Sequence, residues 1–174
     1  MATGVKLRFT TVATPLGELT ILVSDEGVVL TAFDDEEPGA ALERAERSLA
    51  APAHRSTRDL TPIAREVRGY FSGIQRAFSA PLDLRLVGTG FPRRVLTATA
   101  RIPYGELQTY GDVAAEAGSP RGGRAAGNAL ARCPIELFVP CHRVVHAAGT
   151  IGGYGRHDDR KRWLIRHESA GKVS

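Results

Sequence analysis

Residues 109–134 have the sequence TYGDVAAEAGSPRGGRAAGNALARCP, which carries the signals of two short helices joined by a tight turn. Thr109 is a favourable N-cap for the first helix, and Gly118 is a favourable residue just past its end. Ser119 and Pro120 supply turn chemistry, and the second helix follows within a few residues. This spacing predicts a helix-turn-helix motif in the second half of the chain.

The second helix of this motif is built largely from small residues. Ala125, Ala126 and Gly127 follow one another, and Arg121 and Arg124 precede them. Such a surface lets another element or molecule come close to the helix backbone. A tight helix–helix contact and a helix lying in a groove of DNA both fit the pattern, and the flanking arginines favour DNA.

Earlier in the chain, runs of β-branched residues separated by turn signals predict an antiparallel meander. The expected strands are residues 5–13, 16–24 and 27–33. Two helices should follow, over residues 40–50 and 59–73. Thr61 is the expected N-cap of the second helix, Pro62 is its expected first residue, and Gly73 follows its end.

The rest of the chain predicts one more strand and then mostly helices. The strand is expected within residues 78–87, and GTGF at residues 88–91 has the composition of a joint. Further helices are expected over residues 92–102 and 158–170. The last of these begins with two aspartates, which suit the positive end of a helix.

Charge is distributed unevenly on the two sides of residue 86. Residues 1–86 hold 10 lysines and arginines against 12 acidic residues, whereas residues 87–174 hold 13 against 7. We therefore expect two domains, residues 1–86 and residues 87–174. The basic second domain indicates a polyanionic partner such as nucleic acid.

The composition is that of an ordinary globular protein. With 174 residues, 43% of them apolar, the chain can bury a core. No stretch approaches the roughly 18 consecutive apolar residues of a membrane span, and the N-terminus lacks the apolar region of a secretory signal. We therefore expect a cytoplasmic protein, associated with the nucleoid if the source is bacterial, that has no membrane partner.

The dipeptide Cys141-His142 lies in FVPCHRVVH, residues 138–146, and indicates chemistry at the sulfur. A cysteine inside a cell is most often a small buried apolar residue, but the polar, partly cationic residues that follow this one favour the thiolate. Zinc binding is another alternative, for which the ligands would be Cys133, Cys141, His142 and His146. Their spacing matches none of the usual ligand pairings, so no metal is expected.

A lowered thiol pKa alone does not make an effective nucleophile here. An unperturbed thiol with a pKa of about 8.5 is about 3% ionised at pH 7, so a pKa of about 6 gains at most roughly thirtyfold in thiolate. A Brønsted slope of about 0.4–0.5 returns roughly tenfold of that gain. The site therefore needs a positioned electrophile and a base oriented by a carboxylate, for which His142 and Glu168 are the candidates.

Several motifs together resemble the O6-alkylguanine-DNA alkyltransferases, also called methylated-DNA–protein-cysteine methyltransferases. The resemblance covers residues 89–169, and the motifs are PCHRV (140–144), IPYGELQTYGDVA (102–114), RAAGNALAR (124–132) and RKRWLIRHE (160–168). It implies an α+β fold, in which an N-terminal RNase-H-like α/β domain is followed by a mainly helical winged-helix or helix-turn-helix domain that carries the active site. The implied activity is direct-reversal DNA repair by irreversible, single-turnover transfer of an alkyl group from O6-alkylguanine, and from O4-alkylthymine in some cases, to Cys141.

The resemblance also implies roles for individual residues. Cys141 is the acceptor, His142 takes its proton through a water and is oriented by Glu168, and Tyr110 assists the departure of guanine at ring nitrogen N3. Arg124 replaces the flipped-out nucleotide in the base stack while its helix lies in the minor groove. The DNA-binding residues are then Thr109, Arg121, Arg124, Ala125, Ala126 and Gly127.

The resemblance also implies which residues form the pocket for the base. The carbonyl of Val144 would read the exocyclic amine of guanine, and Tyr154 and Gly155 belong to a loop over the base. Cys133 stands where the family usually has an asparagine, and a thiol is too weak a donor and acceptor to replace that amide. It is either a packing thiol or one that pairs with Cys141 on oxidation. Arg156 replaces a small residue on the lip of the pocket and should disfavour bulky adducts.

Two other functions stay open at the level of sequence. One is a non-catalytic alkyltransferase-like protein that flips damaged bases and recruits other repair factors, and Cys141 speaks against it because such relatives lack the cysteine. The other is a thiol hydrolase or redox protein, which needs a site that the sequence does not show. The expected partner is double-stranded DNA containing alkylated bases, bound through the minor groove by a monomer without a cofactor.

Overall fold

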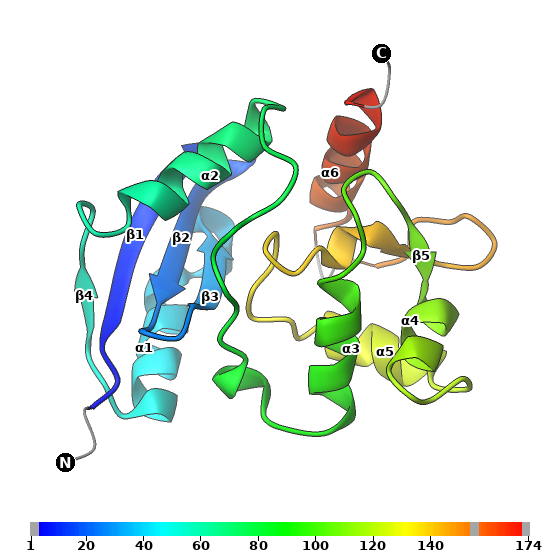
Figure 1. Ribbon diagram of the computed structural model, residues 1–174, viewed down its shortest axis with the longest axis horizontal. Coiled ribbons are helices and arrows are strands. Elements are labelled where there is room, and N and C mark those ends of the chain that lie inside the picture. The colour runs from blue at the N-terminus through cyan, green and yellow to red at the C-terminus, as the bar shows by residue number, and fades with distance from the viewer. Residues whose placement is uncertain (1–3, 154–156, 172–174) are drawn as a thin grey trace. The chain divides into compact units, whose positions relative to one another are not determined.

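The computed structural model describes residues 4–153 and 157–171 of the chain. The chain forms two compact units, Met1–Leu86 and Val87–Ser174, which are described separately below (Figure 1). None of the helices in the described part of the chain has the length and apolar character needed to span a bilayer.

The first unit is organised around a four-stranded sheet. Its strands are β1 (Leu7–Thr14), β2 (Gly17–Val23), β3 (Val28–Phe33) and β4 (Ala53–Arg55). They are arranged in the order β3-β2-β1-β4, with an antiparallel meander of β1, β2 and β3, and with β4 parallel to β1. The predicted meander is therefore present, whereas the three-residue β4 is too short to have been recognised in the sequence.

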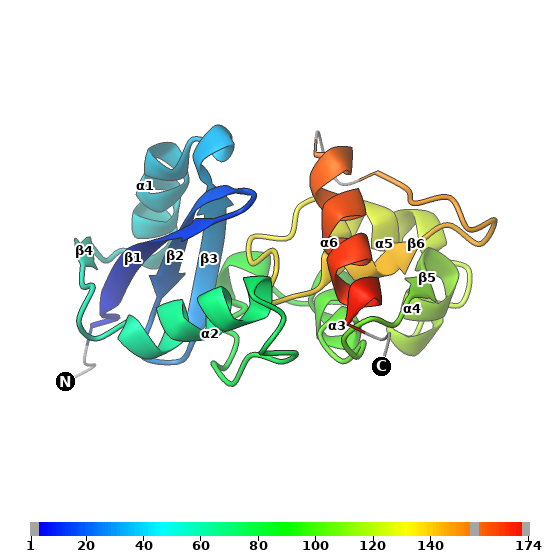
Figure 2. The same ribbon diagram turned by 90° about the horizontal axis from the view of Figure 1, so that it is seen from above.

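Helices cover both faces of this sheet. Helix α1 (Pro38–Leu49) lies on one face and α2 (Thr61–Phe71) on the other, as the two views in Figures 1 and 2 show. Every residue of β3 is consequently buried, because neither face of the strand meets solvent. A short 3-10 helix, η1 (Asp34–Glu36), completes the unit, and a second, η2 (Arg85–Val87), spans the boundary between the two units.

Two details of the first unit differ from the sequence prediction. Thr61 is the first residue of α2 rather than its cap, because its hydroxyl donates to the carbonyl of Thr57 at 3.0 Å. The prediction of a strand within residues 78–87 was wrong, because this segment forms only an isolated bridge between Leu82 and Val28. Asp83 accepts hydrogen bonds from the backbone N–H of Arg85, at 3.1 Å, and from its guanidinium, and the chain turns into η2 instead of continuing along the sheet.

The second unit is mainly helical. Its helices are α3 (Phe91–Thr99), α4 (Tyr110–Glu116), α5 (Gly123–Leu130) and α6 (Asp158–Ala170). Two-residue strands β5 (Gln108–Thr109) and β6 (Val144–Val145) pair in parallel, and a 3-10 helix η3 (Cys141–Arg143) leads into β6. The helix expected over residues 92–102 is shorter than predicted, and the last helix has the predicted bounds.

Helices α4 and α5 pack against each other and form the predicted helix-turn-helix. Thr109 caps α4, since its hydroxyl accepts the backbone N–H of Asp112 at 3.1 Å while the Asp112 carboxylate accepts the N–H of Thr109 at 2.9 Å. Gly118 ends the helix with φ +90°, a conformation that glycine adopts at little cost. Local signals at both ends therefore set this motif, as the sequence indicated.

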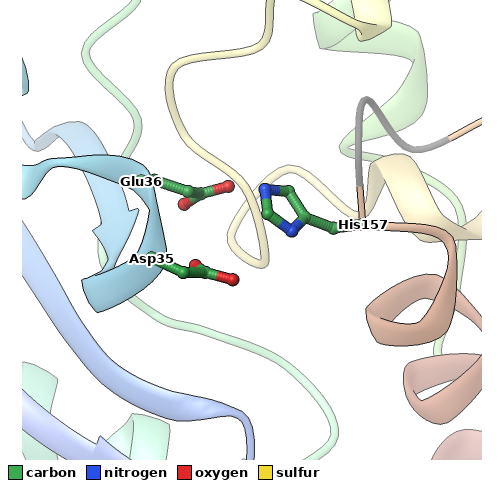
Figure 3. Close-up of side chains that lie close together, drawn as sticks. All are labelled: Asp35, Glu36 and His157. Atoms are coloured by element: carbon green, nitrogen blue, oxygen red, sulfur yellow. The ribbon is translucent and has the colours of Figure 1, made fainter.

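Figure 3 shows the side chains of Asp35, Glu36 and His157. Asp35 and Glu36 lie on η1 of the first unit, and His157 precedes α6 of the second. Because they come from different units, they do not define a site within either one.

Candidate functional site

Cys141 is the first residue of η3 and is almost completely buried, with 3% of its surface exposed. The sulfur borders a small cavity of about 20 Å³, which is enough room for about one water molecule. The other residues that line this cavity are Tyr110, Gly127, Leu130, Ala131, Glu136 and Gly153. A bulky reagent therefore cannot reach the sulfur in this conformation.

The thiol of Cys141 is held in its protonated form. A hydrogen bond with the Cys133 thiol and the burial of the sulfur raise the pKa of Cys141 well above its ordinary value. The negative charge of Glu136 also raises this pKa, and the positive charge of Lys161 lowers it. Since a thiol reacts as its thiolate, Cys141 needs a base to remove its proton.

His142 follows the cysteine directly and supplies a suitable base. Its imidazole is fully buried, and its Nε2 lies 2.7 Å from Oε1 of Glu168. Burial lowers the pKa of His142, although the Glu168 carboxylate opposes this change, so the ring is neutral near pH 7. A carboxylate only accepts hydrogen bonds, so Nε2 carries the hydrogen and Nδ1 carries the free lone pair. This Nδ1 is buried and has no hydrogen-bond partner among the described residues.

Glu168 lies on α6 and anchors a buried network. It accepts from the Nε of Arg143 at 2.9 Å, from the Nη2 of Arg143 at 2.9 Å and from the N–H of Gly105 at 3.0 Å. Burial raises the pKa of Glu168, but the hydrogen bonds from His142 and Arg143 outweigh it and hold that pKa well below its usual range. The carboxylate is therefore a fixed anion that orients His142.

Tyr110 is placed next to Cys141 by the pairing of the two short strands. Thr109 pairs with Val145 in the β5–β6 ladder, so the residue after β5 comes beside the segment that carries the cysteine. The Tyr110 hydroxyl donates to the carbonyl of Gly153 at 3.4 Å. Burial raises the pKa of Tyr110, and the hydroxyl keeps its proton at neutral pH.

Lys161 connects the tyrosine with the strand after the cysteine. Its ammonium donates to the carbonyl of Val144 at 2.5 Å and to the hydroxyl of Tyr110 at 3.3 Å. The side chain is 1% exposed, and burial lowers the pKa of Lys161 to about 8. Because Lys161 is buried and donates to both acceptors, it fixes the positions of Tyr110 and Val144 relative to each other.

A groove of about 690 Å³ opens beside these residues. It is lined by Thr109, Tyr110, Gly111, Gly123, Arg124, Gly127, Asn128, Ala131, His146, Ala147 and Gly153. Four of these residues also line the Cys141 cavity, so the groove leads to the sulfur. Arg121, which precedes α5, and Arg124 and Ala125, which lie on α5, are exposed.

Both units match models of the same protein family. Residues 7–84 match the ribonuclease-like domain of 6-O-methylguanine DNA methyltransferase, and residues 90–170 match the DNA-binding domain of that enzyme. The constitutive methylated-DNA–protein-cysteine methyltransferase of Bacillus subtilis is 36% identical over 161 residues, which are 92% of this chain and 94% of that protein.

The chain belongs to this methyltransferase family. The methylated-DNA–protein-cysteine methyltransferase of Mycobacterium bovis is also 36% identical, over 94% of this chain and 93% of its own. A crystal structure of the Mycobacterium tuberculosis O6-methylguanine methyltransferase superposes with a TM-score of 0.81 at 32% identity, covering 97% of this chain and 96% of the other. The M. tuberculosis protein in complex with DNA gives a TM-score of 0.79 at 32% identity, covering 95% and 94%.

These comparisons confirm the family that the motifs indicated and the predicted fold class. The methyltransferase family combines a ribonuclease-like domain, seen here as the sheet with helices on both faces, with a helical DNA-binding domain. Residues 90–170 are thus a DNA-binding domain, and DNA is the partner.

The structure brings most of the predicted site residues together. Cys141, His142 and Glu168 form one contiguous cluster, and Tyr110 and Val144 join it through Lys161. Cys133 is partly buried and is not among the residues that line the groove.

Other predicted residues lie elsewhere. Ala126 is fully buried, so its side chain is not part of the exposed helix surface. Tyr154, Gly155 and Arg156 lie outside the described residues. Within the described part of the second unit, Cys133, Cys141, His142 and His146 do not bring three ligand atoms within 4.8 Å of one another.

Lys161 is the functional residue that sequence reasoning missed. It lies at positions i, i+3 and i+7 with Leu164 and Glu168, and all three are buried on one face of α6. A lysine in register with a leucine and a glutamate assigned to the site is the signal that would have found it. The surrounding arginines of the RKRWLIRHE motif concealed this signal, because they made the whole helix look solvated.

Proposed function

We propose that this protein repairs DNA by moving the alkyl group of O6-alkylguanine onto Cys141 in a single, irreversible step. The observation that carries the proposal is the buried His142–Glu168 pair, whose unpartnered Nδ1 belongs to the residue next to a protonated cysteine. The family relationship supplies the substrate class, because the relatives are methylated-DNA–protein-cysteine methyltransferases.

Proton removal is the first requirement of this reaction. The neutral imidazole of His142 takes the proton of Cys141 at Nδ1, through a bridging water. The Glu168 carboxylate then stabilises the imidazolium, since it already accepts the Nε2 hydrogen at 2.7 Å. Arg143 keeps that carboxylate ionised throughout.

Alkyl transfer follows from the same geometry. The sulfur attacks the alkyl carbon, a carbon–sulfur bond forms, and the bond from carbon to O6 breaks. The electron pair of that bond stays with guanine, and the hydroxyl of Tyr110 assists by donating to N3 of the leaving base. Burial keeps Tyr110 protonated for this role, and the cation of Lys161 beside it compensates charge that develops on the phenol oxygen.

The product explains why the protein acts once. The thioether formed at Cys141 is not displaced by water under mild conditions. Each molecule therefore removes one alkyl group and is consumed.

Access to DNA requires that the damaged base leave the duplex. A groove of about 690 Å³ can hold an extruded base, whereas the cavity at the sulfur is far too small for a duplex to enter. We propose that α5 binds the minor groove with its exposed face, that Arg124 fills the space of the extruded nucleotide, and that one copy of the chain suffices. Arg121 and Arg124 are exposed as this requires.

The carbonyl of Val144 has a place in this proposal. It accepts a hydrogen bond from Lys161 at 2.5 Å, and a carbonyl oxygen has a second lone pair for the exocyclic amine of guanine. The location that follows is the compartment that holds the chromosome, which is the cytoplasm with its nucleoid in a bacterium.

Intact mass spectrometry tests the proposal directly. The protein is mixed with an equimolar duplex that contains O6-methylguanine, and its mass should rise by about 14 Da, the mass of one methylene group, without further turnover. The Cys141→Ala variant should bind the same duplex and gain nothing. If the wild-type protein binds the duplex and its mass does not change, the non-catalytic alternative that only flips and marks damaged bases replaces this proposal.

A further inference from the structure

Glu136 places a carboxylate at the inner end of the site. The cavity beside Cys141 shares four of its lining residues with the larger groove, and its other lining residues are Leu130, Glu136 and Cys141. Of the described residues that line the cavity, only Glu136 has a carboxyl group. The alkyl transfer described above assigns no role to this side chain.

The turn that carries Glu136 is held in one conformation. The backbone N–H of Val139 donates to the carbonyl of Ile135 at 2.9 Å, and Glu136 and Val139 form an isolated bridge. Ile135, Leu137 and Val139 are at most 2% exposed. Leu137 has φ +76°, a conformation that costs a non-glycine residue energy and persists where the surrounding packing enforces it. The backbone at Glu136 is therefore fixed by buried residues before and after it.

The Glu136 side chain is mostly buried and lies beside a buried cation. It is 22% exposed, and its Oε2 lies 3.9 Å from Nη1 of Arg160, a residue of α6. Its negative charge contributes to the raised pKa of Cys141. The cavity thus has an anionic wall next to the residue that receives the alkyl group.

The geometry of transfer directs the far end of a longer alkyl group toward this wall. During the reaction, the carbon bonded to O6 lies between that oxygen and the sulfur of Cys141, while the guanine occupies the groove. Any further atoms of the alkyl group must lie beside the sulfur, where the cavity of about 20 Å³ is the neighbouring space. A methyl group has no such atoms, so only longer groups meet Leu130 and Glu136.

The chemistry of a carboxylate distinguishes between such groups. The cavity has room for about one water molecule, which is the size of a terminal hydroxyl. A carboxylate only accepts hydrogen bonds, so a hydroxyl can donate to Glu136. A terminal methyl of similar size would displace water from the carboxylate without replacing the lost hydrogen bond. A terminal carboxylate would meet a charge of its own sign.

We propose that Glu136 makes this protein selective among alkyl groups longer than methyl, in favour of those that end in a hydrogen-bond donor, such as 2-hydroxyethyl. This inference rests on the function proposed above. The bonds that change are the same as for methyl. The carbon–sulfur bond forms, the bond from carbon to O6 breaks, its electron pair stays with guanine, and the terminal hydroxyl keeps its proton.

The experiment uses the full chain and three duplexes that differ only in the group on O6 of one guanine. The groups are methyl, 2-hydroxyethyl and propyl, of which the last two have equal numbers of non-hydrogen atoms. Intact mass gives the second-order rate constant of transfer for each duplex. The ratio of the 2-hydroxyethyl rate to the propyl rate should be about tenfold lower in Glu136→Leu than in the wild-type protein, because the leucine accepts no hydrogen bond.

Glu136→Gln separates the charge from the size of the side chain. Its amide oxygen still accepts a hydrogen bond but is neutral, so its ratio should lie between those of the wild type and Glu136→Leu. A fourth duplex carries O6-carboxymethylguanine. Its rate relative to methyl should rise in Glu136→Gln, because the like charge is gone, and this comparison stands even if Glu136→Leu does not fold.

Glu106→Leu provides the matched control. Glu106 is an exposed glutamate of the same unit that lines neither the cavity nor the groove. Both rate ratios of the wild-type protein should be unchanged in this variant. Each ratio is taken within one protein, so a general effect of a substitution on the transfer rate cancels.

The outcomes distinguish this inference from the proposed function. If methyl is transferred but the ratios are the same in the wild type and both Glu136 variants, or change equally in Glu106→Leu, then Glu136 does not select the alkyl group and the inference is wrong. If the wild-type protein accepts no group from any of the duplexes, the proposed function is wrong and the inference falls with it.

Discussion

At the scale of single residues, the site depends on Tyr110 holding one position beside Cys141. Gly152 is part of the reason, because a β-carbon added there would lie 2.8 Å from the Tyr110 hydroxyl oxygen. Gly149 has nearly the same backbone conformation, φ +76° against φ +74°, but a β-carbon there would meet nothing within 4 Å. The two glycines therefore separate the cost of backbone strain from the cost of displacing the tyrosine.

We predict that Gly152→Ala slows methyl transfer at least tenfold, the loss that about 1.4 kcal/mol of misplaced tyrosine would cause. Gly149→Ala carries the same backbone strain and should retain the rate of the wild-type protein. Single-turnover transfer from O6-methylguanine DNA, followed by intact mass, measures both. Equal rates in the two variants would remove Tyr110 from the mechanism.

At the scale of elements, α6 carries buried charges of both signs, among them Glu168 and Lys161. Glu168 and Lys161 point from the same face of the helix into the unit, where the first binds His142 and Arg143 and the second binds Val144. The effect of pH on stability should differ between them, because the folded state favours the charged form of one and the neutral form of the other.

For Glu168, the pKa in the folded state is lowered, so the folded protein binds fewer protons than the unfolded chain in acid. The stabilisation is complete above the ordinary glutamate pKa of 4.5 and is lost as the pH falls below it. Glu168→Gln should therefore lower the free energy of unfolding by about 3–5 kcal/mol at pH 7, since it leaves a buried arginine unpaired.

Urea unfolding at several pH values measures this difference. The gap in the free energy of unfolding between wild type and Glu168→Gln should narrow as the pH falls from 5 to 3.5, a window that spans the ordinary glutamate pKa of 4.5 and lies above the lowered pKa of the folded state. A gap of constant size over that window would show that the carboxylate charge contributes nothing.

For Lys161, burial lowers the pKa from 10.5 to about 8, so between these values the unfolded chain binds more protons than the folded protein. Stability should rise with pH in that interval, because the cost of burying the charge disappears as the lysine loses its proton. The free energy of unfolding of the wild type, minus that of Lys161→Met, should increase from pH 8 to pH 10.5. In contrast, Lys6→Met, which removes an exposed lysine, should leave the slope of the wild-type protein unchanged.

At the scale of the whole molecule, charge is separated between the two units. Residues 1–86 carry a net charge of −2 and residues 87–174 a net charge of +6, counted from lysine, arginine, aspartate and glutamate. Residues 90–170 match a DNA-binding domain, and the positive charge of the second unit suits the negative charge of DNA. Binding should consequently release counterions only from phosphates that contact the second unit.

The salt dependence of DNA binding checks this division. Replacing Arg121 and Arg124 by alanine should reduce the slope of log K against log salt by about 1 for each arginine that contacts phosphate. Arg44, which is exposed on α1 of the first unit, provides the control, and Arg44→Ala should leave the slope unchanged. Fluorescence anisotropy on an unmodified duplex over a range of salt concentrations suffices, and equal slopes for all three proteins would place the DNA elsewhere.

The features that could be predicted from the sequence are those set by nearby residues. Thr109 and Gly118 define α4 because a cap and a positive φ act within one turn. The Cys141-His142 pair was recognisable for a similar reason, since adjacency in sequence puts the base beside the nucleophile.

Features that depend on distant partners could not be predicted. Residues 78–87 look like a strand, yet the Asp83 carboxylate turns the chain through its hydrogen bonds with Ser24 and Arg85. From the sequence alone, Lys161 resembles a surface cation. In the structure it is buried, and Val144 and Tyr110 accept its hydrogen bonds.

The concealment of the Cys141 sulfur has a consequence for the lifetime of the molecule. With 3% of the residue exposed and its proton retained, the sulfur is a poor target for the metabolites and drugs that alkylate cysteines in the cell. A disposable reagent gains most from such inertness, because each stray encounter would waste a whole polypeptide. Selectivity for damaged DNA is thus achieved as much by refusing other electrophiles as by recognising the correct one.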